Sequence, residues 1–239
     1  MRVRNVGSSQ IWPSFGVRCF LNMAHLADVY APIPKAPPAM PIASPAEGLL
    51  RSLGDNVGAL LKKRSRPDGK PETVTVFEAT TGGLIQAALQ SVPGASRFYH
   101  GGSNATLSHR LYPAELIEEL AKGGAQKGAV DRGSNYVSRA NYHKSKIVHT
   151  KAIANHMREH MKTTWCLAES GAAGPTFAPP DMQHSFTVVC IEGPGLSELA
   201  LFESDHNDRE RSMWQFTQAA LQFFEDCIAT SSAGQASRL

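Results

Sequence analysis

A short buried strand that runs directly into a glycine-containing turn and a helix is the feature that most constrains the fold. Residues 73–77 are β-branched and apolar, as expected for a buried strand. The turn 78–83 reads Glu-Ala-Thr-Thr-Gly-Gly, and the helical stretch 84–89 follows it. Strand, polar turn and helix in this order begin a βαβ unit. The sequence therefore predicts an α/β domain.

Further strands and helices are predicted on both sides of this unit. Apolar runs bounded by turn residues predict strands at 97–99 and 165–168, and a hairpin of strands 186–191 and 198–203. Apolar residues at helical spacing predict helices at 49–61 and from about 208 onward. Pro113-Ala114-Glu115 opens another helix, to about 122, and the more polar stretch 147–161 is also predicted as a helix. Together these elements predict a three-layer α/β/α domain with a mixed sheet and helices on both faces.

The composition changes near residue 45, which sets the expected domain boundaries. Six prolines and no sustained apolar period precede this point, so we expect a disordered tail at 1–44. Its first 27 residues hold three arginines and no acidic residue. They suit either an organelle transit peptide or an unstructured leader upstream of a start at Met23.

A helix-start signal opens the expected domain. Ser44 can cap the helix, Pro45 suits its first position and Glu47 completes a capping box. We expect the domain to span 45–232, with a core at 71–229, a polar insertion forming a surface loop at about 127–146, and a C-terminal tail at 233–239.

The charge and cysteine content exclude several classes of protein. A formal net charge of +3 argues for neither a nucleic-acid nor a membrane partner. The four cysteines are scattered and form no CxxC pair, which favours reduced thiols. No apolar run approaches the roughly 20 residues of a membrane helix. We expect a cytoplasmic protein, or a mitochondrial one if the tail is a transit peptide.

Two loops of small residues follow the carboxyl ends of predicted strands. The first, 80–83, is Thr-Thr-Gly-Gly, and the second, 169–175, is Glu-Ser-Gly-Ala-Ala-Gly-Pro. In open α/β sheets ligands bind beyond the carboxyl ends of strands, and small residues let a ligand approach the backbone. A strand–helix turn of this composition also occurs as a turn alone, so the loops indicate a place and not a ligand.

Five motifs in order resemble those of one known family. Residues 78–83 are similar to a Glu-Ser-Cys-Thr-Gly-Gly signature, 92–96 to a Val/Ile-x-Gly-Ser-Ser turn, and 100–102 to the Gly-Gly step that follows it. Residues 170–175 resemble a Thr/Ser-Gly-Ile-Ala-Gly-Pro loop, and Asp208-Arg209 a Gly-Asp-Arg helix start. The family is that of the C-terminal domain of CinA-type proteins, the nicotinamide-nucleotide amidohydrolases. The resemblance covers residues 71–229.

The resemblance implies an activity, a ligand class and a set of binding residues. Active members deamidate nicotinamide mononucleotide by metal-free acyl transfer, with a serine nucleophile activated by a lysine. We therefore expect no cofactor and no metal, a pyridine nucleotide or related small molecule as ligand, and a homo-oligomer. The ligand-binding residues implied are Glu78, Thr81, Gly82, Gly83, Gly101, Gly102, Ser170, Gly171, Ala172, Ala173 and Gly174.

The chain departs from the family at both catalytic positions. Ala79 stands where the nucleophilic serine belongs, and it has no group that can attack a carbonyl. Arg110 is the nearest match to the lysine, and a guanidinium stays protonated and cannot act as a base. Thr80, Ser103 and His109 are the candidate replacements.

Two other groupings have two explanations each. Glu78 and Glu169 both end predicted strands, so they could form an acid/base pair, or Glu78 could cap backbone N–H groups. His156 and His160 stand four apart on a predicted helix, a spacing that suits zinc or two solvent-exposed side chains.

Two functional hypotheses follow. The first is a pyridine-nucleotide amidohydrolase with displaced catalytic residues, in which another hydroxyl lies beside a base. The second is a catalytically inactive descendant that binds a nucleotide or a partner through the same pocket. The metal-dependent pyrophosphatase-like domain that precedes this module in longer family members has no counterpart in the sequence, so we expect its activity to be absent.

Overall fold

The computed structural model describes residues 49–104, 118, 138–177 and 179–236. The predicted tail at 1–44, the helix-start signal at 44–47, and all of the helix at 113–122 except Glu118 lie outside these residues.

A mixed sheet forms the middle layer of the domain. It consists of β1 (Val74–Glu78), β2 (Tyr99–Asn104), β3 (Trp165–Ala172), β4 (Phe186–Gly193) and β5 (Leu196–Glu203), in the order β2-β1-β3-β4-β5. The first three strands in that order are parallel, and β4 and β5 follow as an antiparallel hairpin. The predicted mixed sheet and the predicted hairpin are therefore confirmed.

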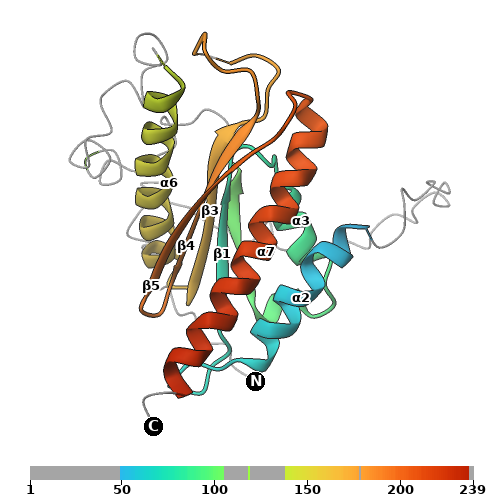
Figure 1. The fold of residues 1–239 in the computed structure, drawn as a ribbon. Helices are drawn as coiled ribbons and strands as arrows, with labels where there is room; N and C mark the ends of the chain where they lie inside the picture. Colours follow the sequence, from blue (N-terminus) through green and yellow to red (C-terminus); the bar gives the residue numbers. More distant parts are fainter. Residues whose placement is uncertain (1–48, 105–117, 119–137, 178, 237–239) are drawn as a thin grey trace, which may run out of the picture. The chain divides into compact units, whose positions relative to one another are not determined.

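Helices cover both faces of this sheet (Figure 1). The helices α2 (Leu49–Lys63), α3 (Leu84–Gln90) and α7 (Arg209–Ala236) pack on one face, and α6 (Arg139–Met161) packs on the other. Side chains alternate along each strand, so Val74, Val76 and Leu167 face the first group while Phe77 and Cys166 face α6. The domain is thus the predicted three-layer α/β/α arrangement.

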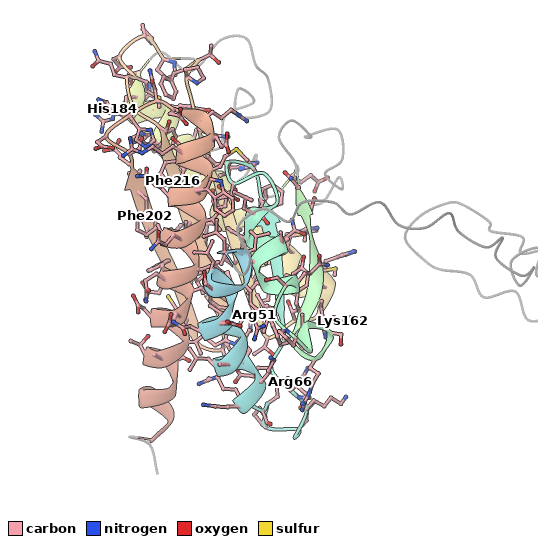
Figure 2. All side chains as sticks on the ribbon, turned by 90° about the vertical axis from the view of Figure 1, so that its right-hand side faces the viewer. Arg51, Arg66, Lys162, His184, Phe202 and Phe216 are labelled. Carbon is pink, nitrogen blue, oxygen red and sulfur yellow. The ribbon has the colours of Figure 1, made fainter. Side chains whose placement is uncertain are left out.

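The labelled residues of Figure 2 show at which end of the sheet the parallel strands finish. Lys162 and Arg66 precede β3 and β1, and they lie at the opposite end of the sheet from His184 (Figure 2). The carboxyl ends of the parallel strands therefore lie at the His184 end, where a ligand of an α/β sheet is expected.

Several predicted boundaries are wrong. The strand predicted at 97–99 begins only at Tyr99 and continues to Asn104 as β2, and Ala95–Arg97 forms a 3₁₀ turn instead. Ser170 to Ala172, predicted as a loop, extends β3 because these residues pair with β4. Leu49, expected on the buried face of α2, is 49% exposed.

The largest correction concerns α6. The predicted loop at 127–146 ends within this helix, which begins at Arg139 and not at 147. Ser138 caps it by accepting a hydrogen bond from the backbone N–H of Asn141. At the other end of the domain, α7 extends to Ala236, beyond the expected boundary at 232. In the part of the chain that the structure describes, no helix is long and apolar enough to cross a membrane.

Two glycines allow α2 to approach α3 and the chain that follows it. A Cβ added at Gly54 would lie 2.3 Å from the carbonyl oxygen of Ala88, and one at Gly58 would lie 2.9 Å from Val92. Backbone cannot move aside as a flexible side chain can, so the spacing of these elements requires glycine at position 54.

We therefore predict that Gly54→Ala destabilises the protein by about 1–3 kcal/mol, although alanine has the higher helix propensity. Chemical denaturation measures this effect. Ser52→Ala, at an exposed position of the same helix, is the control and is expected to change stability little. An increase in the stability of Gly54→Ala would show that α2 and α3 are not in this close contact.

Candidate functional site

The carboxyl ends of β1 and β3 bring the two predicted loops together. Phe77 on β1 is the register partner of Ala168 on β3, so the residues that follow each of them are neighbours. The turn 78–83 and the segment 169–174 therefore meet at one edge of the sheet. This juxtaposition was expected from the sequence, and the hydrogen bonds described below define what the site can do.

Glu78 fixes the start of α3. Its carboxylate accepts hydrogen bonds from the backbone N–H groups of Gly83, Ile85 and Gln86, at 2.8, 3.1 and 2.7 Å. The side chain is fully buried, and burial, with a smaller contribution from Glu169, raises its pKa. Of the two roles considered for Glu78, the structure shows the capping one.

Glu169 binds the turn between β1 and α3. Its Oε1 accepts hydrogen bonds from the backbone N–H groups of Ala79, Thr80 and Thr81, at 2.7, 2.7 and 2.9 Å. Its Oε2 accepts one from the hydroxyl of Thr187 at 2.8 Å. Three converging N–H groups are a geometry that can stabilise an anion, and here the anion is the protein's own carboxylate.

The side chain of Ala79 faces α6. It packs against the cluster that contains Phe77, Ile153 and Val148. The position that holds the nucleophile in the family motif therefore points to the α6 side of the sheet, while Glu169 binds the backbone of the same turn. Its methyl group offers no hydrogen bond and no nucleophile there.

Lys146 reaches this side of the sheet from α6. Its Nζ donates a hydrogen bond to the hydroxyl of Ser170 at 3.2 Å and lies 5.5 Å from the ring centre of Tyr142. Burial lowers the pKa of Lys146 to about 8, opposed by attraction to Glu169. Burial and the nearby Lys146 lower the pKa of His149 to about 3, so this imidazole is neutral. The amine of Lys146 is therefore the one cation in this group of five residues.

Lys146 is not among the site residues predicted from the sequence, because its segment was predicted to be a surface loop. The signals that could have identified it are the cap at Ser138 and the spacing of Tyr142, Lys146 and His149 on one face of a helix.

Of the candidate catalytic residues, the structure describes Thr80 and Ser103. The Thr80 hydroxyl is buried 3.4 Å from that of Thr187, beside the carboxylate network and not beside Lys146. Ser103 lies on β2 as the register partner of Phe77. His109 and Arg110 lie outside the described residues.

The predicted binding glycines have structural reasons for being glycine. A Cβ at Gly102 would lie 2.2 Å from the carbonyl oxygen of Val76, and one at Gly171 would lie 2.1 Å from that of Phe186. Gly82 has a φ of 68°, in the left-handed region that favours glycine. Close strand pairing and turn geometry thus account for these residues without a ligand.

The loop after β3 is held by two side chains, one just before β4 and one at the start of α7. The hydroxyl of Ser185 donates to the carbonyl oxygen of Ala173 at 2.8 Å, and the guanidinium of Arg209 donates to that of Gly174 at 3.3 Å. The Asp208-Arg209 motif therefore connects the start of α7 to this loop, which brings the fourth and fifth sequence motifs together.

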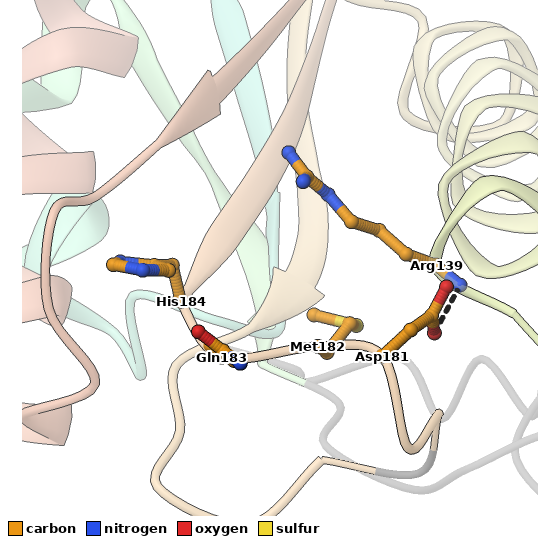
Figure 3. A pocket seen from close by; sticks show the side chains of 5 residues that line it. All are labelled: Arg139, Asp181, Met182, Gln183 and His184. Carbon is orange, nitrogen blue, oxygen red and sulfur yellow. Dashed lines mark hydrogen bonds between the residues drawn. The ribbon is translucent and has the colours of Figure 1, made fainter.

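A pocket of about 230 Å³ lies near the start of α6 (Figure 3). Arg139, Asp181, Met182, Gln183 and His184 line it. Asp181 accepts a hydrogen bond from the backbone N–H of Arg139 at 2.7 Å, and the Arg139 guanidinium binds Glu203. None of the residues predicted from the sequence lines this pocket.

The paired histidines of α6 lack the companions that a metal needs. The rings of His156 and His160 stack with their centres 5.9 Å apart. Over the described residues, no three side chains of His, Cys, Asp or Glu come together as a metal-binding group.

Comparison with a family model identifies the domain. The model of the CinA C-terminal domain matches residues 52–106 and 139–228. These two segments include β1 to β5, the turn 78–83 and the loop 169–174, and they leave out residues 107–138.

Individual relatives agree with this match. "CinA-like protein" of Prochlorococcus marinus strain NATL1A is 29% identical over 60% of this chain, and that of Parasynechococcus marenigrum is 31% identical over 60%. The chain spans only 28% and 29% of the length of these relatives.

Solved structures share the fold. A crystal structure of a CinA superfamily protein from Enterobacter cloacae has a TM-score of 0.55 and 15% identity, over 80% of this chain and 98% of that one. A competence or damage-inducible protein from Enterobacter asburiae has a TM-score of 0.54 and 16% identity, over 75% of this chain and 98% of that one.

The role of Glu169 gives a stability prediction. Glu169→Ala leaves three backbone N–H groups without their acceptor, so we expect a loss of at least about 3 kcal/mol in the free energy of unfolding. Glu203→Ala removes an exposed ion pair with Arg139 and is the matched control, with an expected loss below about 1 kcal/mol. Equal losses in the two variants would contradict the hydrogen-bond network.

The buried amine of Lys146 gives a pH dependence. Its pKa is about 8 in the folded protein and is near 10.5 when the chain unfolds, so the unfolded chain binds more protons between these values. The free energy of unfolding should therefore rise from pH 8 to pH 10.5 in the unmodified protein relative to Lys146→Met. Lys144→Met, at an exposed lysine of the same helix, should follow the unmodified protein. A constant difference between the unmodified protein and Lys146→Met would rule out a buried amine.

Proposed function

This chain belongs to the CinA C-terminal domain family, and we propose that it binds a pyridine nucleotide at the carboxyl ends of β1 and β3 without hydrolysing it. The ligand class rests on family membership. The absence of hydrolysis rests on one observation about this chain, the occupation of the turn amides by Glu169.

Acyl transfer needs a nucleophile and free donors for the oxyanion. Ala79 supplies no nucleophile, and the N–H groups of the turn already bind a carboxylate. Loss of a nucleophile costs on the order of a millionfold in kcat, and loss of one oxyanion donor costs on the order of 10²–10³. A carboxylate beside the site also repels a developing negative charge. These effects together place the expected rate near that of the uncatalysed reaction.

Groups suited to binding remain on the α6 side of the same strand ends. Ser170 offers a hydroxyl, and the ammonium of Lys146 offers a positive charge beside it. With a pKa of about 8, Lys146 is mostly protonated at pH 7. A cation and a hydroxyl at the carboxyl edge of the sheet suit an anionic, amide-bearing nucleotide.

We predict that the purified protein releases no ammonia from nicotinamide mononucleotide above the blank, and that Ala79→Ser leaves this unchanged. The serine would restore a nucleophile, but the oxyanion donors would remain bound to Glu169. The same nucleotide should raise the melting temperature of the unmodified protein, and less so that of Ser170→Ala. Turnover by the unmodified protein, or no thermal shift at millimolar nucleotide, would overturn the proposal.

A second candidate function is hydrolysis through Ser170 and Lys146. Their 3.2 Å hydrogen bond is the arrangement of a nucleophile and its base. In that reaction, neutral Lys146 takes the Ser170 proton while Oγ attacks the amide carbonyl, ammonia leaves with that proton, and water hydrolyses the acyl-serine. Binding is the first proposal because the turn N–H groups that could hold an oxyanion already bind Glu169.

The second candidate has its own signature. Ammonia release would rise with pH to a plateau above about 8, where Lys146 is deprotonated, and would be lost in both Ser170→Ala and Lys146→Met. Activity that survives Ser170→Ala would exclude this pair.

A further inference from the structure

The sheet ends in an open strand, β5. It is the last strand in the order β2-β1-β3-β4-β5, and among the described strands it pairs with β4 only. The pairing runs without a register shift from Leu196 to Glu203, and five of its eight residues are exposed. Within the described part of the chain, an unpaired row of backbone donors and acceptors therefore lies along this edge.

Proteins usually protect such an edge against other chains. Short strands, prolines, bulges and lysines are the usual means. β5 has eight residues in unbroken register, and its sequence Leu-Ser-Glu-Leu-Ala-Leu-Phe-Glu contains neither proline nor lysine. Apart from the charges of Glu198 and Glu203, the edge therefore lacks these protections and is available for strand addition.

The exposed side chains of β5 are apolar near its centre. Leu199 and Leu201 are 37% and 38% exposed. Their register partners on β4 are Cys190 and Val188, in the clusters that also contain α6 residues, so both leucines lie on the α6 side of the sheet. Ile147 of α6, on the same side, is 36% exposed. An apolar surface therefore accompanies the open backbone edge.

We infer that a second copy of this chain docks here, its β5 pairing antiparallel with β5 about a twofold axis at Ala200. The two five-stranded sheets then form one continuous sheet. This surface is independent of the proposed nucleotide site.

The sequence of β5 is complementary to itself in this register. Each Leu199 lies opposite the other copy's residue 201, so both exposed leucines pair with leucines. Glu198 lies opposite Phe202, and Glu203 lies opposite Ser197, so no two carboxylates face each other.

Each of the two neighbouring registers pairs an exposed leucine with a polar residue. Moving the axis to residue 201 puts Leu199 opposite Glu203, and moving it to residue 199 puts Leu201 opposite Ser197. Both shifts keep the α6 sides of the two copies together, so they are the relevant competitors. Ala200 is the axis that places both exposed leucines opposite leucines.

A charge exchange tests the surface and the register. The unmodified full chain should have twice its 25.8 kDa mass in light scattering over a dilution series. The double variant Leu199→Lys/Leu201→Lys places like charges opposite each other and should be monomeric. The variant Leu199→Lys/Leu201→Glu places the two introduced charges, lysine and glutamate, opposite each other in this register only, whereas the axis at residue 201 brings the introduced glutamates together and the axis at residue 199 brings the introduced lysines together. This variant should return to the dimer, more weakly as salt is raised.

Controls separate docking from folding. Circular dichroism and the monomer's thermal unfolding should be alike in both double variants, because the two leucines are exposed. Leu49→Lys, at an exposed leucine of α2, should remain a dimer. A monomeric unmodified chain, or a dimer that survives Leu199→Lys/Leu201→Lys, would overturn the inference. A folded but monomeric Leu199→Lys/Leu201→Glu variant would overturn the register.

Discussion

The hydrogen bonds between the Glu169 carboxylate and the turn after β1 determine the architecture of the site. A buried carboxylate is costly unless donors surround it, and Glu169 receives three from the backbone of Ala79 to Thr81. These bonds cross from β3 to β1 at the point where both strands end. Glu78 holds the following residues in the same way, by accepting hydrogen bonds from the first N–H groups of α3. Two carboxylates thus fix one turn, from two adjacent strands.

Three features of the chain determine the chemistry of this site. Ala79 leaves the family's nucleophile position without a hydroxyl, Glu169 occupies the N–H groups of the turn, and Lys146 introduces an amine beside Ser170. The first two features oppose hydrolysis by acyl transfer at the turn, since neither attack nor charge stabilisation is provided there. The third provides a cation and a hydroxyl at the strand ends. Binding without hydrolysis is the function that accommodates all three.

Much of the fold could be predicted from the sequence, because local patterns determine it. The β4–β5 hairpin followed from two strand-like runs on either side of a turn, and α7 followed from apolar residues at helical spacing. The start of α6 could not be recognised, since its first turns carry few apolar residues. The loop expected at 170–172 became part of β3 because pairing with β4 outweighs the turn propensity of Gly171. The two strand ends that form the site were located correctly, but the contacts of Glu169 and Lys146 depend on tertiary packing, which no single-sequence pattern encodes.

Amide hydrogen exchange of the ligand-free protein tests the central claim most directly. If Glu169 binds the turn, the N–H groups of residues 79, 80 and 81 exchange slowly, at rates close to those of β1, although they belong to no helix or strand. Rapid exchange at these three amides, typical of a solvent-exposed turn, would contradict the account. It would mean that these N–H groups are free to bind an oxyanion, and that the departures from a hydrolase are those at the two catalytic positions, Ala79 and Arg110.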